Sequence, residues 1–587
     1  MAPDIHSLIT SVVDLAPVAR EGFTVHKEIL AADKTMAVQF GRLEIQQKMY
    51  DEWRGYWRDE SRLRSFAKEH PSMVRRMLKQ IAILTQALTD ATGLEHRFSF
   101  AKTERPRQIE EDVSSFRFDD LSPSIVDTFR ARAKANLSFI QKCRYVLRSK
   151  RDLPQLNALL EIIKDCNVAL RDLSPPLDSG MLMRSEIDPL KTLPHPHLKR
   201  LAEAAACEAK LTDEPSEATR YHDLSLAAQF TAVLKYETAK PVFRFGPQDV
   251  HIDASYELGK YETMALLFDY PLKGEKRVVL IEWVKDGGRP ERRKEVYDLA
   301  LVLAASKPGA MLIASCYGVI EDPKYGRVGL VLAPPPHIRS GLPKMLPPGT
   351  VSAFRMPVSL RDLITRKQAS TGSGDIMDLS LRFTIAQRLL DAVHVMHSTT
   401  WVHKNIRPDS IIFFPSRERS KSGAMGPSLS KPQAYALDAP LLVGFNHIRS
   451  SLPQELMNSN IGYNNRQYSV SVVKRDMSFD AYSHPERFLN PGMEYRNYHD
   501  LYSVGCVLLE IGYWDTIDRL LSIHSGLSDP VAVYDHLRVF AEGIDGMMGL
   551  TYGNVVRKLL DLGGIRRDFD SAGMETRLAA TLSQCSA

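Results

Sequence analysis

The residue types that could do chemistry are concentrated between His403 and Ser410, in the order His-Lys-Asn-Ile-Arg-Pro-Asp-Ser. The third position, Asn405, carries an amide, which cannot serve as a base near neutral pH. The last position, Ser410, offers only a short and neutral oxygen. The segment therefore offers neither a base at Asn405 nor a charged metal ligand at Ser410.

A helix is predicted directly before this loop, and it would hold the loop in place. Apolar residues recur at spacings of three and four, which predicts one buried face of an amphipathic helix that ends near His397. These residues are Leu381, Ile385, Leu389, Val393 and Met396.

The loop resembles the catalytic loop of protein kinases, whose pattern is H-R-D-L-x-x-x-N. The resemblance implies that Asn405 stands where the kinase Asp takes the proton of the substrate hydroxyl. It also implies that Ser410 stands where the kinase Asn holds a second magnesium ion. His403 and Pro408 are kept, so the framework of the loop survives although its chemistry is lost.

A second kinase position is altered in the apolar, β-branched segment Lys276–Val284, which is expected to be the third strand of a small lobe. If its V-L-I-E aligns with the kinase V-A-I-K, the phosphate-pairing Lys is replaced by Glu282, whose carboxylate would repel nucleotide phosphates. Lys285 is an alternative, but it points to the opposite face of the strand. Glu291–Ala305 is expected to be the small-lobe helix, and Met311–Val319 and Val328–Ala333 the next strands.

The remaining nucleotide and metal positions are also altered. Only Gly259 and Gly274 lie between Pro247 and Lys285, so the glycine-rich phosphate loop is missing. Gly444-Phe445-Asn446 stands where a kinase has D-F-G. Gly444 has no side chain to bind magnesium, whereas the packing residue Phe445 is kept.

The kinase positions that are kept are those that hold the fold. Glu486 lies in His-Pro-Glu, in place of A-P-E, and Asp500 begins a helix that closely matches the one that follows in kinases. Each of these side chains alone is also common in packed cores. The order and spacing of His403, Phe445, Glu486 and Asp500 together predict a kinase-like fold without catalytic residues.

Composition bounds the class of protein. A chain of 587 residues predicts roughly two to four domains. Its content of 44% hydrophobic and 25% charged residues is that of globular domains, and a net charge of +5 is too small to indicate nucleic acid as the partner. No C-x-x-C spacing occurs and no apolar stretch is long enough for a membrane span, which predicts a cytoplasmic protein with reduced thiols. The cysteines are Cys143, Cys166, Cys207, Cys316, Cys506 and Cys585.

The first block of the chain is expected to be an all-helical bundle, with helices over 5–15, 37–53, 72–92, 125–147 and 153–173. Two of its segments, Phe40–Trp57 and Ile140–Pro175, resemble the fungal HeLo domain of prion-inhibition and cell-death proteins. Those domains have an early helix that leads to a Trp and a late basic-aromatic helix followed by a Leu-rich one.

A basic run without Asp or Glu lies inside this block. Its members are Arg130, Arg132, Lys134, Lys142, Arg144, Arg148, Lys150 and Arg151. Such a segment can meet anionic lipid head groups, with about 1 kcal/mol from each cation near the surface. The alternative is that it is simply the solvated face of a bundle helix.

The whole chain is expected to have an α+β organisation. A HeLo-like helical bundle over residues 1–178 is followed by a helical brace over 179–245 and a bilobal kinase-like domain over 246–587. A Ser-, Pro- and Gly-rich stretch at 415–439 is expected to be an exposed insertion. This layout is similar to that of mixed-lineage kinase domain-like proteins.

Three functions fit this layout. The first is a cell-death effector of the heterokaryon-incompatibility or immunity type, in which a pseudokinase controls a bundle that oligomerises and moves to the plasma membrane. The second is an inert scaffold that binds protein partners. The third is an unorthodox kinase with weak ATP binding. No metal site is expected, and the upstream protein trigger stays open.

Overall fold

The computed structural model has an α+β architecture, with helices in the N-terminal part and a mixed sheet in the C-terminal part. It describes residues 5–31, 34–90, 99–100, 122–142, 145–146, 149–174, 184, 186–236, 241–257, 262–285, 289–339, 356–369, 377–416, 435–445, 481–489, 494–522, 530–564 and 572–585. The chain divides into two compact units, Met1–Ala228 and Gln229–Ala587. Within the described residues, no helix combines the length and the apolar character needed to cross a bilayer.

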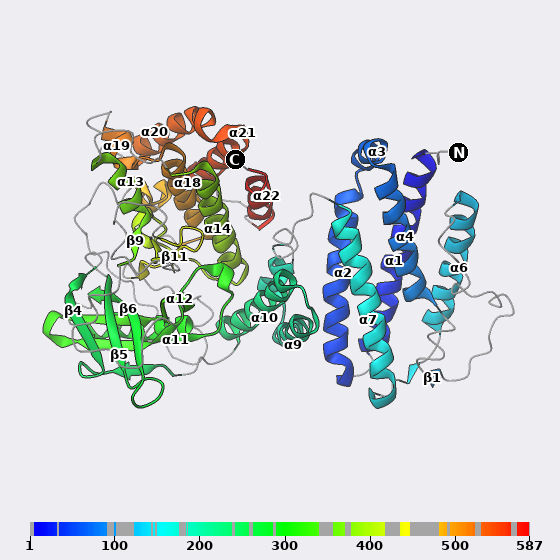
Figure 1. Cartoon of the computed structure of the whole chain (residues 1–587), viewed down its shortest axis with the longest axis horizontal. Coiled ribbons are helices and arrows are strands. Elements are labelled where there is room, and N and C mark those ends of the chain that lie inside the picture. Colours follow the sequence, from blue (N-terminus) through cyan, green and yellow to red (C-terminus); the bar gives the residue numbers. More distant parts are fainter. Residues whose placement is uncertain are drawn as a thin grey trace, which may run out of the picture. The chain divides into compact units, whose positions relative to one another are not determined.

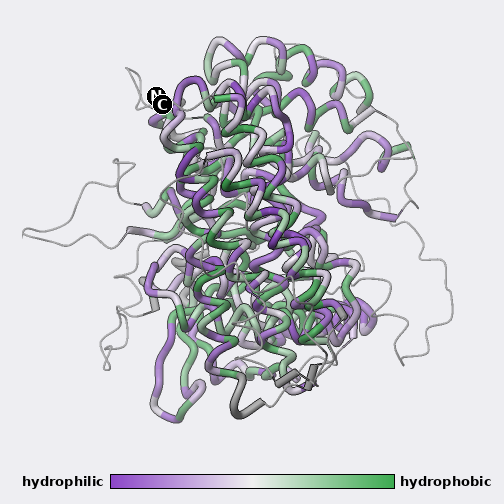
Figure 2. The backbone as a smooth tube through the Cα atoms, turned by 90° about the vertical axis from the view of Figure 1, so that its right-hand side faces the viewer, coloured by the Kyte–Doolittle hydropathy of each residue, from purple (hydrophilic) through white to green (hydrophobic). Residues whose placement is uncertain are grey.

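The first unit is a bundle whose long helices lie side by side (Figure 1). Its elements are α1 (Ile5–Ala31), α2 (Ala37–Trp57), α3 (Glu60–Glu69), α4 (Pro71–Thr89), α6 (Pro123–Lys142) and α7 (Ser149–Asp172). Hydrophobic and hydrophilic residues interleave along these helices (Figure 2). This is the amphipathic pattern that lets each helix bury one stripe.

The bundle core is drawn from all of these helices. Leu15, Phe23, Tyr50, Leu78 and Leu137 are fully buried within it, and burying a side chain of this size stabilises the fold by about 1.5–3 kcal/mol. At one end of α2, the indole N–H groups of Trp53 and Trp57 both donate to Ser174 Oγ, at 3.1 and 2.9 Å. These bonds satisfy two buried donors and tie α2 to the end of α7.

Two further helices, α9 (His195–Leu211) and α10 (Pro215–Lys235), follow the bundle, and we call them the brace. None of the described residues of the brace belongs to the apolar core of the bundle. The fully buried Arg42 of α2 instead donates to Glu208 of α9 at 2.5 Å. It also donates to Asn157 and Glu161 of α7, at 2.9 and 2.7 Å.

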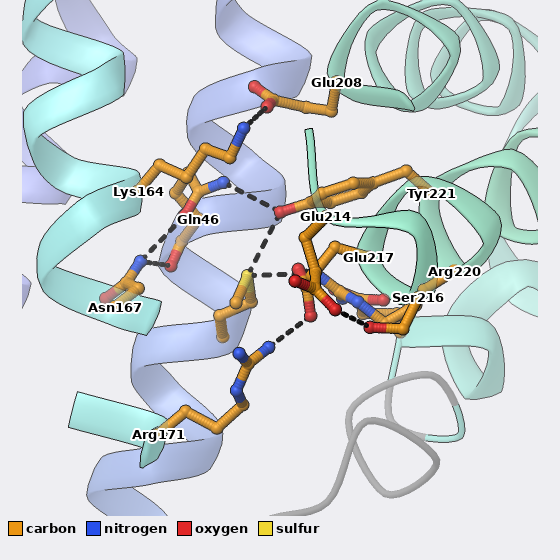
Figure 3. A network of polar contacts seen from close by, with 12 residues as sticks. Gln46, Lys164, Asn167, Arg171, Glu208, Glu214, Ser216, Glu217, Arg220 and Tyr221 are labelled. Carbon is orange, nitrogen blue, oxygen red and sulfur yellow. Dashed lines mark hydrogen bonds and ion pairs between the residues drawn. The ribbon is translucent and has the colours of Figure 1, made fainter. Parts of the chain in front are cut away.

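A second set of charges fixes the start of α10, as Figure 3 shows. Arg171 of α7 and Arg220 of α10 both donate to Glu217. Arg220 also donates to Glu186 at 2.6 Å. Buried ion pairs therefore hold the brace on the bundle, and such pairs are costly to break when one partner is removed.

Several predictions for the first unit need correction. Helix α1 extends to Ala31, beyond the predicted stretch, and α3 was not predicted. Helix α6 ends at Lys142, and Tyr145–Val146 (β2) pairs antiparallel with Ser99–Phe100 (β1), so the block is not purely helical. Of the basic run, Arg130, Arg132, Lys134 and Lys142 therefore lie in α6, and Lys150 and Arg151 lie in α7. The predicted boundaries at residues 178 and 245 stay predictions; α9 and the first part of α10 belong to the same unit as the bundle.

The second unit begins with a six-stranded sheet in the order β3-β7-β8-β6-β5-β4. Its strands are β3 (Phe243–Phe245), β4 (Val250–Glu257), β5 (Glu262–Phe268), β6 (Lys276–Lys285), β7 (Cys316–Asp322) and β8 (Arg327–Leu332). Only β3 pairs in parallel, with β7, and helix α11 (Pro290–Ala304) packs on β7 and β8. β7 begins later than predicted because Gly309–Met311 form a 3-10 turn that ends at Leu312, whose φ is 58°.

The rest of the second unit is mainly helical. Its elements are α12 (Pro336–Arg339), β9 (Val358–Ser359), α13 (Leu360–Ala369), α14 (Leu379–Ser398), β10 (Ile411–Phe413), β11 (Leu441–Leu442), α17 (Pro485–Leu489), α18 (Asn497–Tyr513), α19 (Ile517–Ser522), α20 (Pro530–Gly543), α21 (Asp545–Leu560) and α22 (Ala572–Leu582). The strands β9, β10 and β11 form a small antiparallel sheet. The Leu442 amide donates to Leu312 O at 2.7 Å, which ties this sheet to the segment between α11 and β7.

The buried network around Arg42 is expected to make a large contribution to the stability of the first unit. Arg42→Ala leaves the buried carboxylate of Glu208 without its best partner, because Lys164 lies 3.7 Å away. We expect a loss of about 3–5 kcal/mol. Native-state hydrogen exchange of the α2 and α9 amides in the full chain measures this loss. The matched control is Arg20→Ala, which breaks a more exposed pair with Asp51 and should cost about 0–1 kcal/mol. Equal losses would show that the buried network does not hold the brace.

Candidate functional site

The candidate site begins where α14 ends. The helix buries Ile385, Leu389 and Val393, and it stops at Ser398. The following chain turns sharply, with positive φ values of 70° at Thr400 and 71° at Lys404. This loop leads through a 3-10 turn, Pro408–Ser410 (η8), into β10.

Asp500 of α18 anchors the loop from within the core. Its fully buried carboxylate accepts hydrogen bonds from the backbone N–H groups of His403 and Lys404, at 2.7 and 2.9 Å. It also accepts one from the hydroxyl of Tyr495 at 2.7 Å. Burial alone would raise the pKa of Asp500. The hydrogen bond to His397 and the charge of that ring lower the pKa by more than burial raises it, so the pKa lies below its ordinary value. Asp500 is thus a charged anchor for the loop backbone.

Aromatic packing holds the other side of the loop. The His403 ring lies 5.0 Å from the Phe445 ring, and Trp401 stacks on Phe445 at 5.9 Å between ring centroids. Phe230 of α10 meets Trp401 edge-on at 5.9 Å. Burial lowers the pKa of His403 to about 4, although the charge of Asp500 opposes this shift. His403 is therefore neutral near pH 7 and has the surroundings of a packing residue.

The structure brings four of the residues singled out by the kinase resemblance together as one hydrogen-bonded cluster: Glu282, Asn405, Ser410 and Gly444. The buried Glu282 carboxylate on β6 accepts from the Gly444 amide at 3.1 Å. The Asn405 side-chain amide donates to Gly444 O at 2.8 Å. The Ser410 hydroxyl lies 2.8 Å from Asn405 O and 2.9 Å from Arg407 O. We call these four residues the cleft cluster.

The backbone of Gly444 explains why no side chain is present there. Its φ is 100°, a conformation that favours glycine. A Cβ atom at this position would lie 2.7 Å from Asn405 Nδ2 and 2.8 Å from Ser410 Cβ. The cleft cluster therefore fills the space that a metal-binding carboxylate at position 444 would need.

A second carboxylate, which the sequence analysis did not identify, faces the same side of the sheet. Glu262 of β5 is the direct cross-strand partner of Glu282, so both side chains point to one face. Burial, together with the negative charge of Asp409, raises the pKa of Glu262 to about 7. The register of the β5–β6 hairpin could have revealed this pair, because only strand pairing places two carboxylates side by side.

Most polar groups of the cleft cluster are bonded to one another. Asn405 carries a neutral amide, which does not accept a proton near neutral pH. Its side-chain N–H donates to Gly444 O. Gly444 supplies backbone groups only, and both of them are used within the cluster. The carboxylate of Glu282 lies in this site, and Glu262 adds negative charge as the pH rises above about 7. Negative charge here opposes the binding of phosphate groups.

Glu486 lies in a buried histidine cluster at the start of α18. It accepts from the Tyr498 hydroxyl at 2.6 Å, and His484, Glu486 and His499 lie within 4.8 Å of one another through their ligand atoms. Both histidines accept backbone N–H groups at Nδ1, at 3.2 and 3.1 Å, so their Nε2 atoms carry the proton. This arrangement offers no imidazole lone pair to a metal ion.

The predicted lipid-facing residues are only partly within the described structure. Arg130 of α6 forms ion pairs with Asp14 and, at 2.9 Å, with Asp127. Arg132 is partly buried and Lys134 is exposed on the same helix. Arg144 and Arg148 lie outside the described residues, as do the side chains of Lys142, Lys150 and Arg151.

Comparisons of the sequence with protein-family models and with curated proteins found no match.

The conformation of Gly444 predicts a specific loss of stability. Gly444→Ala should cost about 1–3 kcal/mol for the backbone at positive φ, and a further 1–3 kcal/mol, roughly, for the forced contacts with Asn405 and Ser410. Gly274→Ala is the matched control, because Gly274 has a φ of 86° but open space around its Cβ position. Denaturant unfolding of the two full-length variants measures the difference. Equal losses would contradict the close packing of the cleft cluster.

Proposed function

We propose that the second unit is a protein-kinase-like domain without catalytic function, and that it regulates the helical bundle that precedes it. The observation that carries this proposal is the cleft cluster. Four positions that would hold the Lys, the base and two magnesium ligands in a kinase are bonded to one another instead. The positions proposed to keep the fold, His403, Phe445 and Asp500, surround them.

An unorthodox kinase is the less favoured function, because several contributions to phosphoryl transfer are missing at once. In kinases the metal ions, the lysine and the base each contribute by positioning and by neutralising charge. The cleft cluster provides a buried carboxylate where positive charge is needed. Weak binding of ATP remains compatible with this site, whereas efficient phosphoryl transfer is not.

We further propose that the helical bundle is HeLo-like and engages anionic membranes when it is released, as in cell-death effectors of the heterokaryon-incompatibility or immunity type. The bundle has a closed apolar core of its own, and α6 carries Arg132 and the exposed Lys134. Release is expected to be accompanied by assembly into a homo-oligomer and by movement from the cytoplasm to the plasma membrane. An inert scaffold that binds proteins is the second candidate.

We propose that the second unit acts on the bundle through the brace. Helix α10 crosses the division between the units, and its Arg220 and Tyr221 make contacts in the first unit while its Phe230 packs on Trp401 in the second. A restraint of this kind is a two-state bias, so a trigger must bind the two states with different affinities. Phosphorylation in 416–430 or 450–483 is one candidate trigger; all but Ser416 and 481–483 of these segments lies outside the described residues.

The first prediction from this proposal concerns nucleotides. ATP binding measured by calorimetry should be weak and independent of magnesium, because the cleft cluster offers no carboxylate for magnesium besides Glu282, which already accepts the Gly444 amide. Glu282→Gln removes the negative charge but keeps an acceptor for the Gly444 amide, so it should strengthen ATP binding without making it depend on magnesium. Micromolar, magnesium-dependent affinity of the unchanged chain, or phosphate transfer that Asn405→Ala abolishes, would contradict the proposal.

The second prediction concerns membranes. Residues 1–178 should bind anionic liposomes more tightly than the full chain, and added salt should weaken this binding by screening. Arg144→Glu with Arg148→Glu should reduce the binding of the fragment. The matched control is Arg75→Glu with Arg76→Glu, a charge reversal at exposed positions of α4.

Each arm of this experiment tests a separate claim. Equal binding by the full chain and the fragment would exclude the restraint. Equal effects of the two charge reversals would exclude a specific role for the basic run and leave only an effect of net charge.

A further inference from the structure

The C-terminal helix α22 carries one ionisable group into the core of the second unit. The helix packs on α14 and α21. Most of its inward side chains are apolar, such as Leu578 and Leu582, but Glu575 is also buried, with only 1% of its surface exposed. A buried carboxylate requires compensating partners, so its surroundings indicate what it does.

The partners of Glu575 are two histidines, one turn apart on α14. His397 Nδ1 lies 3.0 Å from one carboxylate oxygen, and His394 Nδ1 lies 3.4 Å from the other. The second ring nitrogen of His397 lies 3.3 Å from Asp500 Oδ2. The same oxygen of Asp500 accepts the His403 amide. A chain of contacts therefore runs from α22 through α14 and α18 to the loop.

The charge of His397 is central to this chain of contacts. A neutral imidazole has one N–H, so between two carboxylates it would present a lone pair to one of them, whereas the protonated ring donates to both. Burial lowers the pKa of His397, but Glu575 and Asp500 outweigh burial and raise it to about 9. Burial likewise raises the pKa of Glu575, but His397 and His394 lower it to about 2. His397 is thus a cation between two anions at pH 7.

We propose that α22 holds the loop in place, with Glu575 as a positioning residue that acts through His397 and Asp500. The carboxylate of Glu575 keeps His397 charged, and the charged ring orients the Asp500 oxygen that holds the His403 amide. Displacement of α22, or loss of the proton from His397, then loosens the backbone at His403 and Lys404.

The direction of the pH effect follows from the groups that face His397. These are Glu575 from α22, Asp500 from α18, with the Tyr495 hydroxyl upon it, His394 from α14 and the neutral His403. Because the pKa of His397 is raised from 6.5 to about 9, its contribution to stability is complete below about pH 6.5 and is lost as the pH rises through 9. Burial lowers the pKa of Lys404 to about 8 although Asp500 opposes this shift, and burial raises the pKa of Glu510 to about 8, so both groups also titrate in this range. Their effect is removed by comparing variants that all retain Lys404 and Glu510.

The test is hydrogen exchange of the His403 and Lys404 amides in the full chain, corrected for intrinsic rates. Glu575→Gln should raise their exchange about tenfold or more at pH 7, the size expected for a change of one pKa unit, and should flatten the pH dependence of their protection. Leu578→Ala, which removes a buried apolar contact from the same helix, should lower the overall stability but leave that pH dependence unchanged. Glu542→Gln, an exposed carboxylate on α20, controls for net charge.

The proposal fails if Glu575→Gln and Leu578→Ala give the same pH profile, or if loop protection is unchanged by Glu575→Gln. Where Glu575→Gln does not fold, Glu575→Asp takes its place, because the shorter side chain keeps the charge but lies farther from His397. Its loop amides must lose protection at a lower pH than those of the unchanged chain do. The same pH profile in the two chains would overturn the proposal.

Discussion

A buried carboxylate must be satisfied by the protein around it, and this constraint shapes the centre of the second unit. Glu282 lies in the middle of β6 with no exposed surface, and it accepts the amide of Gly444 from across the site. That bond draws the Gly444 backbone toward the sheet, in a conformation with positive φ that favours glycine. Asn405 then bonds to the carbonyl of the same residue. The cleft cluster is therefore a set of mutually dependent contacts, in which changing one member leaves polar groups of the others unpaired.

The same constraint operates in the brace and at the C-terminus. Arg42 and Glu208 are both buried and join α2 to α9, while Glu575 and His397 join α22 to α14. Buried ion pairs add little net stability compared with apolar packing, but they strongly penalise any arrangement that separates them. Buried ion pairs between helices therefore favour one docked geometry of those helices over geometries that separate the charges. This property suits a chain proposed to switch between a restrained and a released state.

Much of the fold could be predicted from local patterns. Helices α2, α4 and α14, together with strand β6, follow directly from apolar periodicity and β-branched runs, because each buries one face or the whole of its length. Helix α18 was expected from the kinase resemblance. The residues at which α1 and α6 end were harder to predict from the sequence. Helix α1 runs through Pro17 to Ala31, although a proline inside a helix usually kinks or ends it. The pairing of Tyr145 with Phe100 depends on a partner outside the local sequence.

The candidate site was predictable as a set of positions but not as a set of contacts. The kinase resemblance grouped Glu282, Asn405, Ser410 and Gly444 as positions of one site, but a carboxylate at position 282 indicated only repulsion of phosphate. The sequence contains no sign that a backbone amide would satisfy it. Glu262 depends on strand register, and Glu575 lies 178 residues from His397. Long-range pairing of this kind is decided by tertiary packing rather than by any local pattern.

The exchange of the Gly444 amide with solvent most directly tests the central claim, that the cleft cluster is complete without a ligand. Hydrogen exchange resolved to this residue, with and without magnesium and ATP, reports whether the bond to Glu282 exists in solution. The account predicts that the amide is protected in the absence of ligand and that magnesium and ATP leave its protection unchanged. An amide that exchanges freely alone and becomes protected only when magnesium and ATP are added would contradict it.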